Sequence, residues 1–170
     1  SICQETFGLS VSETDRRFKV AYALCYLLPG IPKVYYSSLH GYLGNNKSED
    51  RSGRPEFVLG ENSNGEFFPW LAMLGDVRTR LPALIYGNYT ELWRPGDSPL
   101  WSFCRSLEGE TPIVIVVNNG NNNEQISIPV SVFGEETPLR EILGQEHRLL
   151  VRDGILLGGM EPGVLAVTKA

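Results

Sequence analysis

A short apolar segment between two helix-like stretches constrains this chain more than any other feature. Ile31-Pro32-Lys33-Val34-Tyr35-Tyr36 is rich in β-branched and aromatic residues, which predicts a strand. The segment alternates poorly between apolar and polar residues, as is typical of a parallel strand covered on both faces. Pro29-Gly30 separates it from the preceding helix by a tight turn. Helix, tight turn and buried strand together make one step of an α/β protein, in which the strand needs neighbours.

A helix is predicted on each side of this segment. Ser12 is the expected N-cap of the first helix, because Glu13 and Asp15 make its first turn acidic. The second helix is expected from about Phe67, with Pro69 in its first turn and Pro82 after its end. Apolar residues recur at helical spacing in both, at Phe18, Ala21, Tyr22, Cys25 and Leu28 and at Phe67, Trp70, Leu71, Leu74, Val77 and Leu81. Arg78 and Arg80 lie near the C-terminal end of the second helix, where cations are favoured.

Residues 37 to 66 are predicted to be a long loop that contains five glycines and many charged residues. About 30 irregular residues inside a folded domain are unusual, and loops of this length are commonly functional or disordered. In a barrel of alternating strands and helices, the loop after a strand lies on the catalytic face.

The second half of the chain reads as all-β. Close turn signals such as Pro95-Gly96-Asp97 and Asp153-Gly154 separate short apolar runs. This spacing predicts an antiparallel sandwich or Greek key. We therefore expect two domains, an α/β part over residues 1–85 and an all-β part over residues 86–170. The predicted strands are Tyr89–Trp93, Leu100–Ser106, Ile113–Asn118, Gln125–Val130, His147–Val151, Ile155–Leu157 and Val164–Thr168.

The α/β part is too small to bury its own apolar surface. A single parallel strand between two helices leaves its edges unpaired and its faces uncovered. Two explanations remain: the chain belongs to a longer one, or it docks onto another copy or a partner. We favour the first.

Composition excludes some partners. The net charge of −5 and the pI near 5.1 argue against nucleic acid, which needs clustered lysine and arginine. The longest apolar stretch, Val20 to Leu28, is far shorter than the roughly 20 residues of a membrane span. Cys3, Cys25 and Cys104 form no metal-ligand spacing with each other or with the two histidines, so we expect ordinary thiols.

One block of sequence carries a resemblance to a known family. Leu28-Pro29-Gly30-Ile31-Pro32-Lys33-Val34-Tyr35-Tyr36 resembles the "LPG-(I/T)-P-x-(I/V)-Y-Y" segment of the α-amylase family, glycoside hydrolase family 13. Phe67–Leu84, ending Arg80-Leu81-Pro82-Ala83-Leu84 and followed by Gly87, resembles the family's eighth barrel helix. Further matches run through the all-β part in the family's order, at Ile113–Asn118, Leu139–Gly144 and Asp153-Gly154-Ile155-Leu156.

The resemblance implies a C-terminal portion of such a protein. The fold would be α/β plus all-β: the last helix–strand–helix part of a (β/α)8 TIM barrel, namely the seventh helix, eighth strand, long loop and eighth helix, followed by a C-terminal β-sandwich. The parent would be a retaining α-glycosidase or transglycosidase acting on α-linked glucans or oligosaccharides. The partner of this chain would be the missing N-terminal part of the barrel. The resemblance implies no cofactor in this chain, although calcium is possible in earlier parts of the parent's barrel.

The chain is expected to lack the catalytic groups. Retaining hydrolysis needs two carboxyl groups roughly 5–5.5 Å apart, a nucleophile and an acid/base. The resemblance places these at the ends of the fourth and fifth strands, with a third aspartate at the end of the seventh, all upstream of Ser1. We therefore expect no catalytic residue here and no activity of the chain alone.

Asp50 and Arg54 are the candidate substrate-binding residues. Family members often carry Asp and Arg four residues apart after the eighth strand, where they hold a sugar on the non-reducing side of the cleavage point. Asp50 and Arg54 have this spacing, and Pro55 follows. A carboxylate accepts hydrogen bonds from sugar hydroxyls and a guanidinium donates them in a fixed fork. The alternative is a solvated charged loop.

The sequence also departs from the family pattern. The family usually continues with Gly-Asp-Glu after the tyrosine pair, where this chain has Ser37-Ser38-Leu39. This replacement suggests a divergent subfamily or a relative without activity, so a non-catalytic sugar-binding or accessory protein of the same fold stays open.

Other chemistry finds little support in the sequence. Glu49 and Glu61 are interpreted as solvated loop residues, and Ser37-Ser38 near His40 lacks the GxSxG turn of a serine nucleophile. The aromatic residues of the first sandwich strands suggest either a sugar-binding surface or packing against the barrel, and packing is the favoured interpretation. They are Tyr89, Trp93, Trp101 and Phe103.

Overall fold

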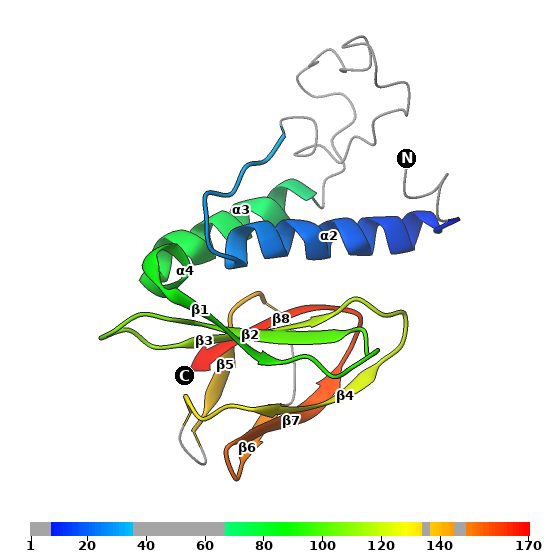
Figure 1. Cartoon of the computed structure of the whole chain (residues 1–170). Coiled ribbons are helices and arrows are strands. Elements are labelled where there is room, and N and C mark those ends of the chain that lie inside the picture. Colours follow the sequence, from blue (N-terminus) through cyan, green and yellow to red (C-terminus); the bar gives the residue numbers. More distant parts are fainter. Residues whose placement is uncertain (1–7, 36–66, 134–136, 145–148) are drawn as a thin grey trace.

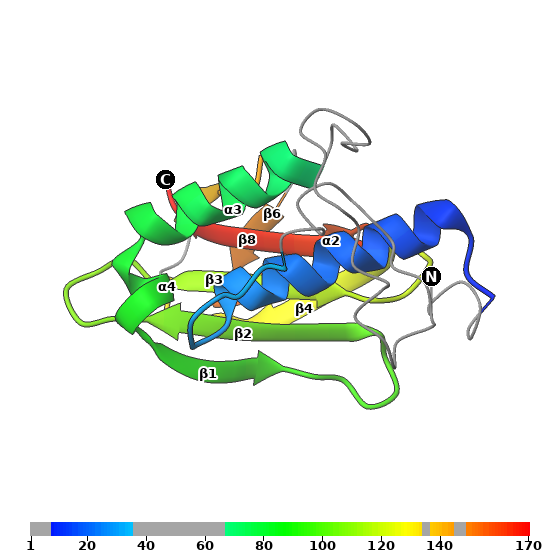
Figure 2. The ribbon, with the colours of Figure 1, turned by 90° about the horizontal axis from the view of Figure 1, so that it is seen from above.

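Two helices lie across one face of a five-stranded antiparallel sheet, and a three-stranded antiparallel sheet covers its other face (Figure 1). This arrangement is seen in a computed structural model that describes residues 8–35, 67–133, 137–144 and 149–170. Seen from above, α2 and α3 run side by side over the sheet, and the edge strand β1 lies beyond them (Figure 2).

Helix α2 spans Val11–Leu27 and begins two residues earlier than the sequence predicts. Ser10, not Ser12, is the N-cap: its hydroxyl accepts from the backbone N–H of Glu13 at 3.2 Å. Glu13 returns the interaction by accepting from the N–H of Ser10 at 3.0 Å. Ser10 and Ser12 both have an acidic residue three positions on, so the spacing alone does not distinguish the two caps.

The strand expected over Ile31–Tyr36 is not formed in the described residues. Residues 31–35 carry no strand, and Tyr36 lies outside the described residues. Ile31 is 95% exposed and Tyr35 is 46% exposed. A strand exists only through hydrogen bonds to a neighbouring strand, so the segment has the composition of a buried strand without its partner.

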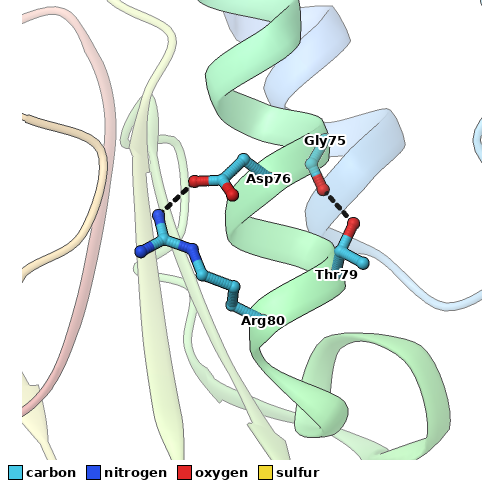
Figure 3. A network of polar contacts seen from close by, with 4 residues as sticks. All are labelled: Gly75, Asp76, Thr79 and Arg80. Carbon is cyan, nitrogen blue, oxygen red and sulfur yellow. Dashed lines mark hydrogen bonds and ion pairs between the residues drawn. The ribbon is translucent and has the colours of Figure 1, made fainter.

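Two helices follow in place of the single predicted one. α3 spans Phe67–Arg80 and α4 spans Pro82–Tyr86. Leu81 is extended between them, since a residue before proline avoids the helical region. On the exposed side of α3, Arg80 pairs with Asp76 one turn earlier, and the Thr79 hydroxyl donates to the carbonyl oxygen of Gly75 at 2.6 Å (Figure 3).

The predicted antiparallel sandwich is present, with eight strands among the described residues where seven were predicted. The five-stranded sheet has the order β1-β2-β3-β8-β5, and the three-stranded sheet has the order β4-β7-β6. The strand that was not predicted is β5, which has three residues, two of them the charged arginine and glutamate, and so lacks an apolar strand pattern. The strands are β1 Asn88–Trp93, β2 Leu100–Ser106, β3 Ile113–Asn118, β4 Glu124–Pro129, β5 Leu139–Glu141, β6 Leu149–Arg152, β7 Ile155–Met160 and β8 Gly163–Lys169.

The five-stranded sheet separates two apolar cores. On β3, the side chains of Ile113, Ile115 and Val117 face the helices, while those of Val114 and Val116 face the smaller sheet. This strand is buried on both sides because side chains alternate between the faces of a sheet. The helix-side core joins residues of α2, α3 and β3, so both halves of the chain share one core; the division at residue 85 stays a prediction.

Candidate functional site

The predicted sugar-contact residues Asp50 and Arg54 lie outside the described residues. The same holds for Glu49, Glu61 and the Ser37-Ser38-His40 group, so these interpretations stay predictions. What the structure does place are the residues that flank the predicted long loop: the segment that leaves α2 and the start of α3 at Phe67.

Arg78 fixes the first of these ends. It lies on α3 but its side chain reaches the C-terminal end of α2, where it is 7% exposed. Its guanidinium donates to the carbonyl oxygens of Tyr26, of Leu28 at 3.2 Å and of Gly30 at 2.5 Å. A cation is favourable here because the last carbonyls of a helix have no partners within it and carry partial negative charge.

Arg105 holds the same helix end from the sandwich. This β2 residue is fully buried and donates from Nη1 to the carbonyl oxygen of Leu27 at 2.9 Å. Its Nη2 donates to the carbonyl oxygen of Gly87 at 2.8 Å, just after α4. We call Arg78 and Arg105 the arginine clasp. The clasp sets the direction in which the chain leaves α2 toward the predicted sugar-contact loop.

The electrostatics of the clasp follow from burial. Burial lowers the pKa of Arg78 below its ordinary value. Burial, and then the nearby positive charge of Arg78, lower the pKa of Arg105. Charge-assisted hydrogen bonds to helix carbonyls offset this cost of burying two cations side by side. The sequence pattern predicts Arg78 near the C-terminal end of its own helix, and Arg105 was not among the predicted site residues. The signal was present, because Arg105 follows Trp101 and Phe103 on one face of an alternating strand.

The aromatic residues of the first sandwich strands divide between core and surface. Phe103 is fully buried, and Trp101 packs beside it with ring centroids 4.9 Å apart. Tyr89 is 39% exposed and lies 5.3 Å from Phe103, measured between ring centroids. Trp101 also donates from Nε1 to the carboxylate of Glu91 at 3.2 Å. The favoured interpretation as packing holds for Phe103 and Trp101, while Tyr89 keeps an open face.

The described residues include two of the three cysteines. Cys25 is exposed and Cys104 is buried, and burial raises the pKa of the Cys104 thiol. Within the described ranges no three histidine, cysteine or acidic side chains gather closely enough to hold a metal ion. None of the described helices is long and apolar enough to cross a membrane.

Comparison with known proteins gives a consistent result. No protein-family model matches the chain. Curated relatives are the β/α-amylase of Paenibacillus polymyxa, 32% identical over 93 residues, and the cyclomaltodextrin glucanotransferase of Klebsiella oxytoca, 28% identical over 148 residues. These matches cover 55% and 75% of this chain. The curated relatives that the chain resembles are members of the α-amylase family, glycoside hydrolase family 13.

Solved structures share the fold of most of this chain. The chain superposes on an Anoxybacillus α-amylase with a TM-score of 0.78 at 22% identity, over 92% of this chain and 32% of that one. The debranching enzyme from Nostoc punctiforme gives 0.72 at 22% identity, over 91% and 31%. The chain spans 7% and 22% of the length of the two curated relatives above. It thus corresponds to a minor part of these family members.

Proposed function

We propose that this chain is the C-terminal part of an α-amylase-like glycoside hydrolase or transglycosidase that acts on α-glucans. In this proposal α2, the extended segment after it, and α3 close a (β/α)8 barrel, and the sandwich supports them from outside. Asp50 and Arg54 contact a sugar at the catalytic face. The catalytic carboxylates lie in another part of the protein, so the chain alone is inactive.

The observation that carries the proposal is the exposed segment Ile31–Tyr35. It follows α2 and precedes α3 in the chain, and these two helices pack side by side, so it stands in the sequence where a barrel has a strand between neighbouring helices. It has the composition of a buried strand, and yet Ile31 is 95% exposed. A preceding barrel strand beside it would pair its backbone and cover its side chains.

The names of the relatives support the substrate class. They include a cyclomaltodextrin glucanotransferase, a neopullulanase and a cyclomaltodextrinase. Because both hydrolases and transferases occur among them, the proposal names α-glucans as the substrate class and leaves open whether the reaction is hydrolysis or transfer.

Activity measurements test this proposal in two arms. The 170-residue chain should release no reducing sugar from soluble starch, while a longer product that includes the preceding coding sequence should do so. In that longer protein, Asp50→Ala and Arg54→Ala should each lower kcat/KM by about tenfold to a hundredfold, because each removes charged hydrogen bonds to the sugar. Starch hydrolysis by the 170-residue chain would contradict the proposal.

A second candidate is a non-catalytic sugar-binding or accessory protein of the same fold. Ser37-Ser38-Leu39, in place of the family's Gly-Asp-Glu, favours it. The longer product decides between the two candidates: a barrel without the three catalytic carboxylates would bind sugar and leave starch intact.

A further inference from the structure

A cavity opens where the N-terminal halves of α2 and α3 meet the turn between β7 and β8. Its volume is about 450 Å³, within the roughly 300–1,000 Å³ of small-molecule sites. Helix α2 lines one side, Trp70 of α3 another, and the β7–β8 turn the floor. The lining residues are Ser12, Asp15, Arg16, Lys19, Val20, Trp70, Pro162, Gly163 and Val164.

Two of these residues carry buried N–H groups that lack an acceptor. Among the described residues, neither Trp70 Nε1 nor Arg16 Nη1 has a hydrogen-bond partner. Arg16 is nevertheless held in place, because its Nη2 donates to the side-chain oxygen of Asn121 at 2.7 Å. Buried donors are nearly always paired in folded proteins. Two unpaired donors on residues of one cavity therefore point to a ligand that brings acceptor atoms.

The rest of the lining narrows the chemistry of that ligand. The charged lining is mixed: the carboxylate of Asp15 accepts hydrogen bonds, and the cationic side chains of Arg16 and Lys19 donate them. Val20 and Val164 are buried apolar walls, and the Trp70 side chain is half-buried beside them. Sugar hydroxyls both donate and accept, and the C–H faces of a sugar ring pack on apolar and aromatic surfaces.

We infer that this cavity binds a neutral oligosaccharide, separately from Asp50 and Arg54. Trp70 and Arg16 donate to its hydroxyl oxygens, and Asp15 accepts from its hydroxyl groups. Naming the sugar as α-linked glucose rests on the proposed function, and the presence of a sugar site rests on the cavity alone.

Titration of the 170-residue chain with maltoheptaose tests the inference. Binding is measured by calorimetry and by tryptophan fluorescence. Affinity on the order of 1 mM is expected, since a few hydrogen bonds and one aromatic contact replace contacts with water. Trp70→Phe keeps the ring and removes the N–H, and Asp15→Ala removes the carboxylate at a position that favours alanine. Each should weaken binding by about tenfold.

Matched controls separate the cavity from the rest of the surface. Asp76→Ala removes an exposed acid from α3, and Trp93→Phe alters a half-buried tryptophan of β1. Both should bind within about twofold of wild type, inside the usual scatter of surface substitutions. The fluorescence change on binding should persist in Trp93→Phe and vanish in Trp70→Phe.

Three results would overturn the inference. The first is that no neutral oligosaccharide binds at a sugar concentration 20-fold above the expected Kd of ~1 mM. The second is equal binding by all four variants, and the third is a Trp70 fluorescence response to inorganic phosphate alone. Binding of cellohexaose but not maltoheptaose, with the same variant pattern, would support the sugar site. That last result would contradict the α-glucan assignment of the proposed function and would leave the inferred sugar site intact.

Discussion

Arg105 of β2 donates a hydrogen bond of 2.9 Å from Nη1 to the carbonyl oxygen of Leu27, the last residue of α2. The two residues are 78 positions apart in the sequence. With Arg78, this contact joins the sandwich to the end of the helix from which the proposed barrel segment departs.

Arg105→Met should destabilise the chain by about 2–4 kcal/mol. The substitution keeps an apolar stem of similar length but leaves the carbonyl oxygens of Leu27 and Gly87 without their charged donor. Urea unfolding followed by circular dichroism measures the change. Arg94→Met, at an exposed position, is the control and should change the free energy of unfolding by less than about 0.5 kcal/mol. Equal effects of the two variants would show that the hydrogen bonds of Arg105 do not stabilise the fold.

Gly87→Ala should cost about 1–3 kcal/mol through overcrowding. An added Cβ would lie 2.3 Å from the carbonyl oxygen of Ala83 and 2.8 Å from that of Ser106. Gly159→Ala is the matched control, since its Cβ would meet only an ordinary contact 3.7 Å away, at the Gln125 side chain. Thermal unfolding of both variants checks the prediction, which fails if Gly87→Ala is as stable as Gly159→Ala.

Ser10→Ala should destabilise the chain by about 1 kcal/mol, because it removes the N-cap of α2. Ser12→Ala is the control, because the sequence pattern predicts Ser12 as the N-cap and the structure does not. The ordering of these two unfolding free energies decides which serine caps the helix.

Glu13 should make part of the stability depend on pH. Hydrogen bonds from the backbone N–H and the hydroxyl of Ser10 hold the pKa of Glu13 below its ordinary value of 4.5. A lowered folded-state pKa means stabilisation that is complete above pH 4.5 and is lost as the pH falls through the lower, folded-state value. Unfolding measured at intervals from pH 7 to pH 3 should therefore show a smaller loss for Glu13→Gln than for wild type. Parallel curves would contradict the contact.

Ile31→Ser tests barrel closure by comparing this chain with the proposed longer product. In the 170-residue chain the residue is 95% exposed, so the free energy of unfolding should change by less than about 0.5 kcal/mol. In a longer product that supplies the preceding strands, the same substitution should cost about 2–4 kcal/mol, because Ile31 would be buried. A negligible effect in both proteins would argue against barrel closure.

Sequence patterns predicted the sandwich better than the helical part. Short apolar runs such as Ile113–Asn118 and the glycine-containing turns predicted most strands within one or two residues, since each strand has its partners inside this chain. β5 was missed because three residues give too little pattern. The segment Ile31–Tyr35 was predicted as part of a strand from its composition, but composition does not tell whether a neighbouring strand is present to pair with it.

Local sequence patterns could not predict the arginine junction or the cavity. Arg78 contacts residues about 50 positions away, and the cavity joins α2, α3 and the β7–β8 turn. Such contacts arise only from tertiary packing, for which helical or strand periodicity carries no signal. Asp50 and Arg54 remain a prediction that rests on spacing and family resemblance.

The sequence of the coding DNA upstream of Ser1 tests the central claim most directly. The account predicts roughly 200–300 further codons of alternating strands and helices, with a carboxylate at the end of the fourth, fifth and seventh strands. A start codon at or just before Ser1 would contradict barrel closure within one protein.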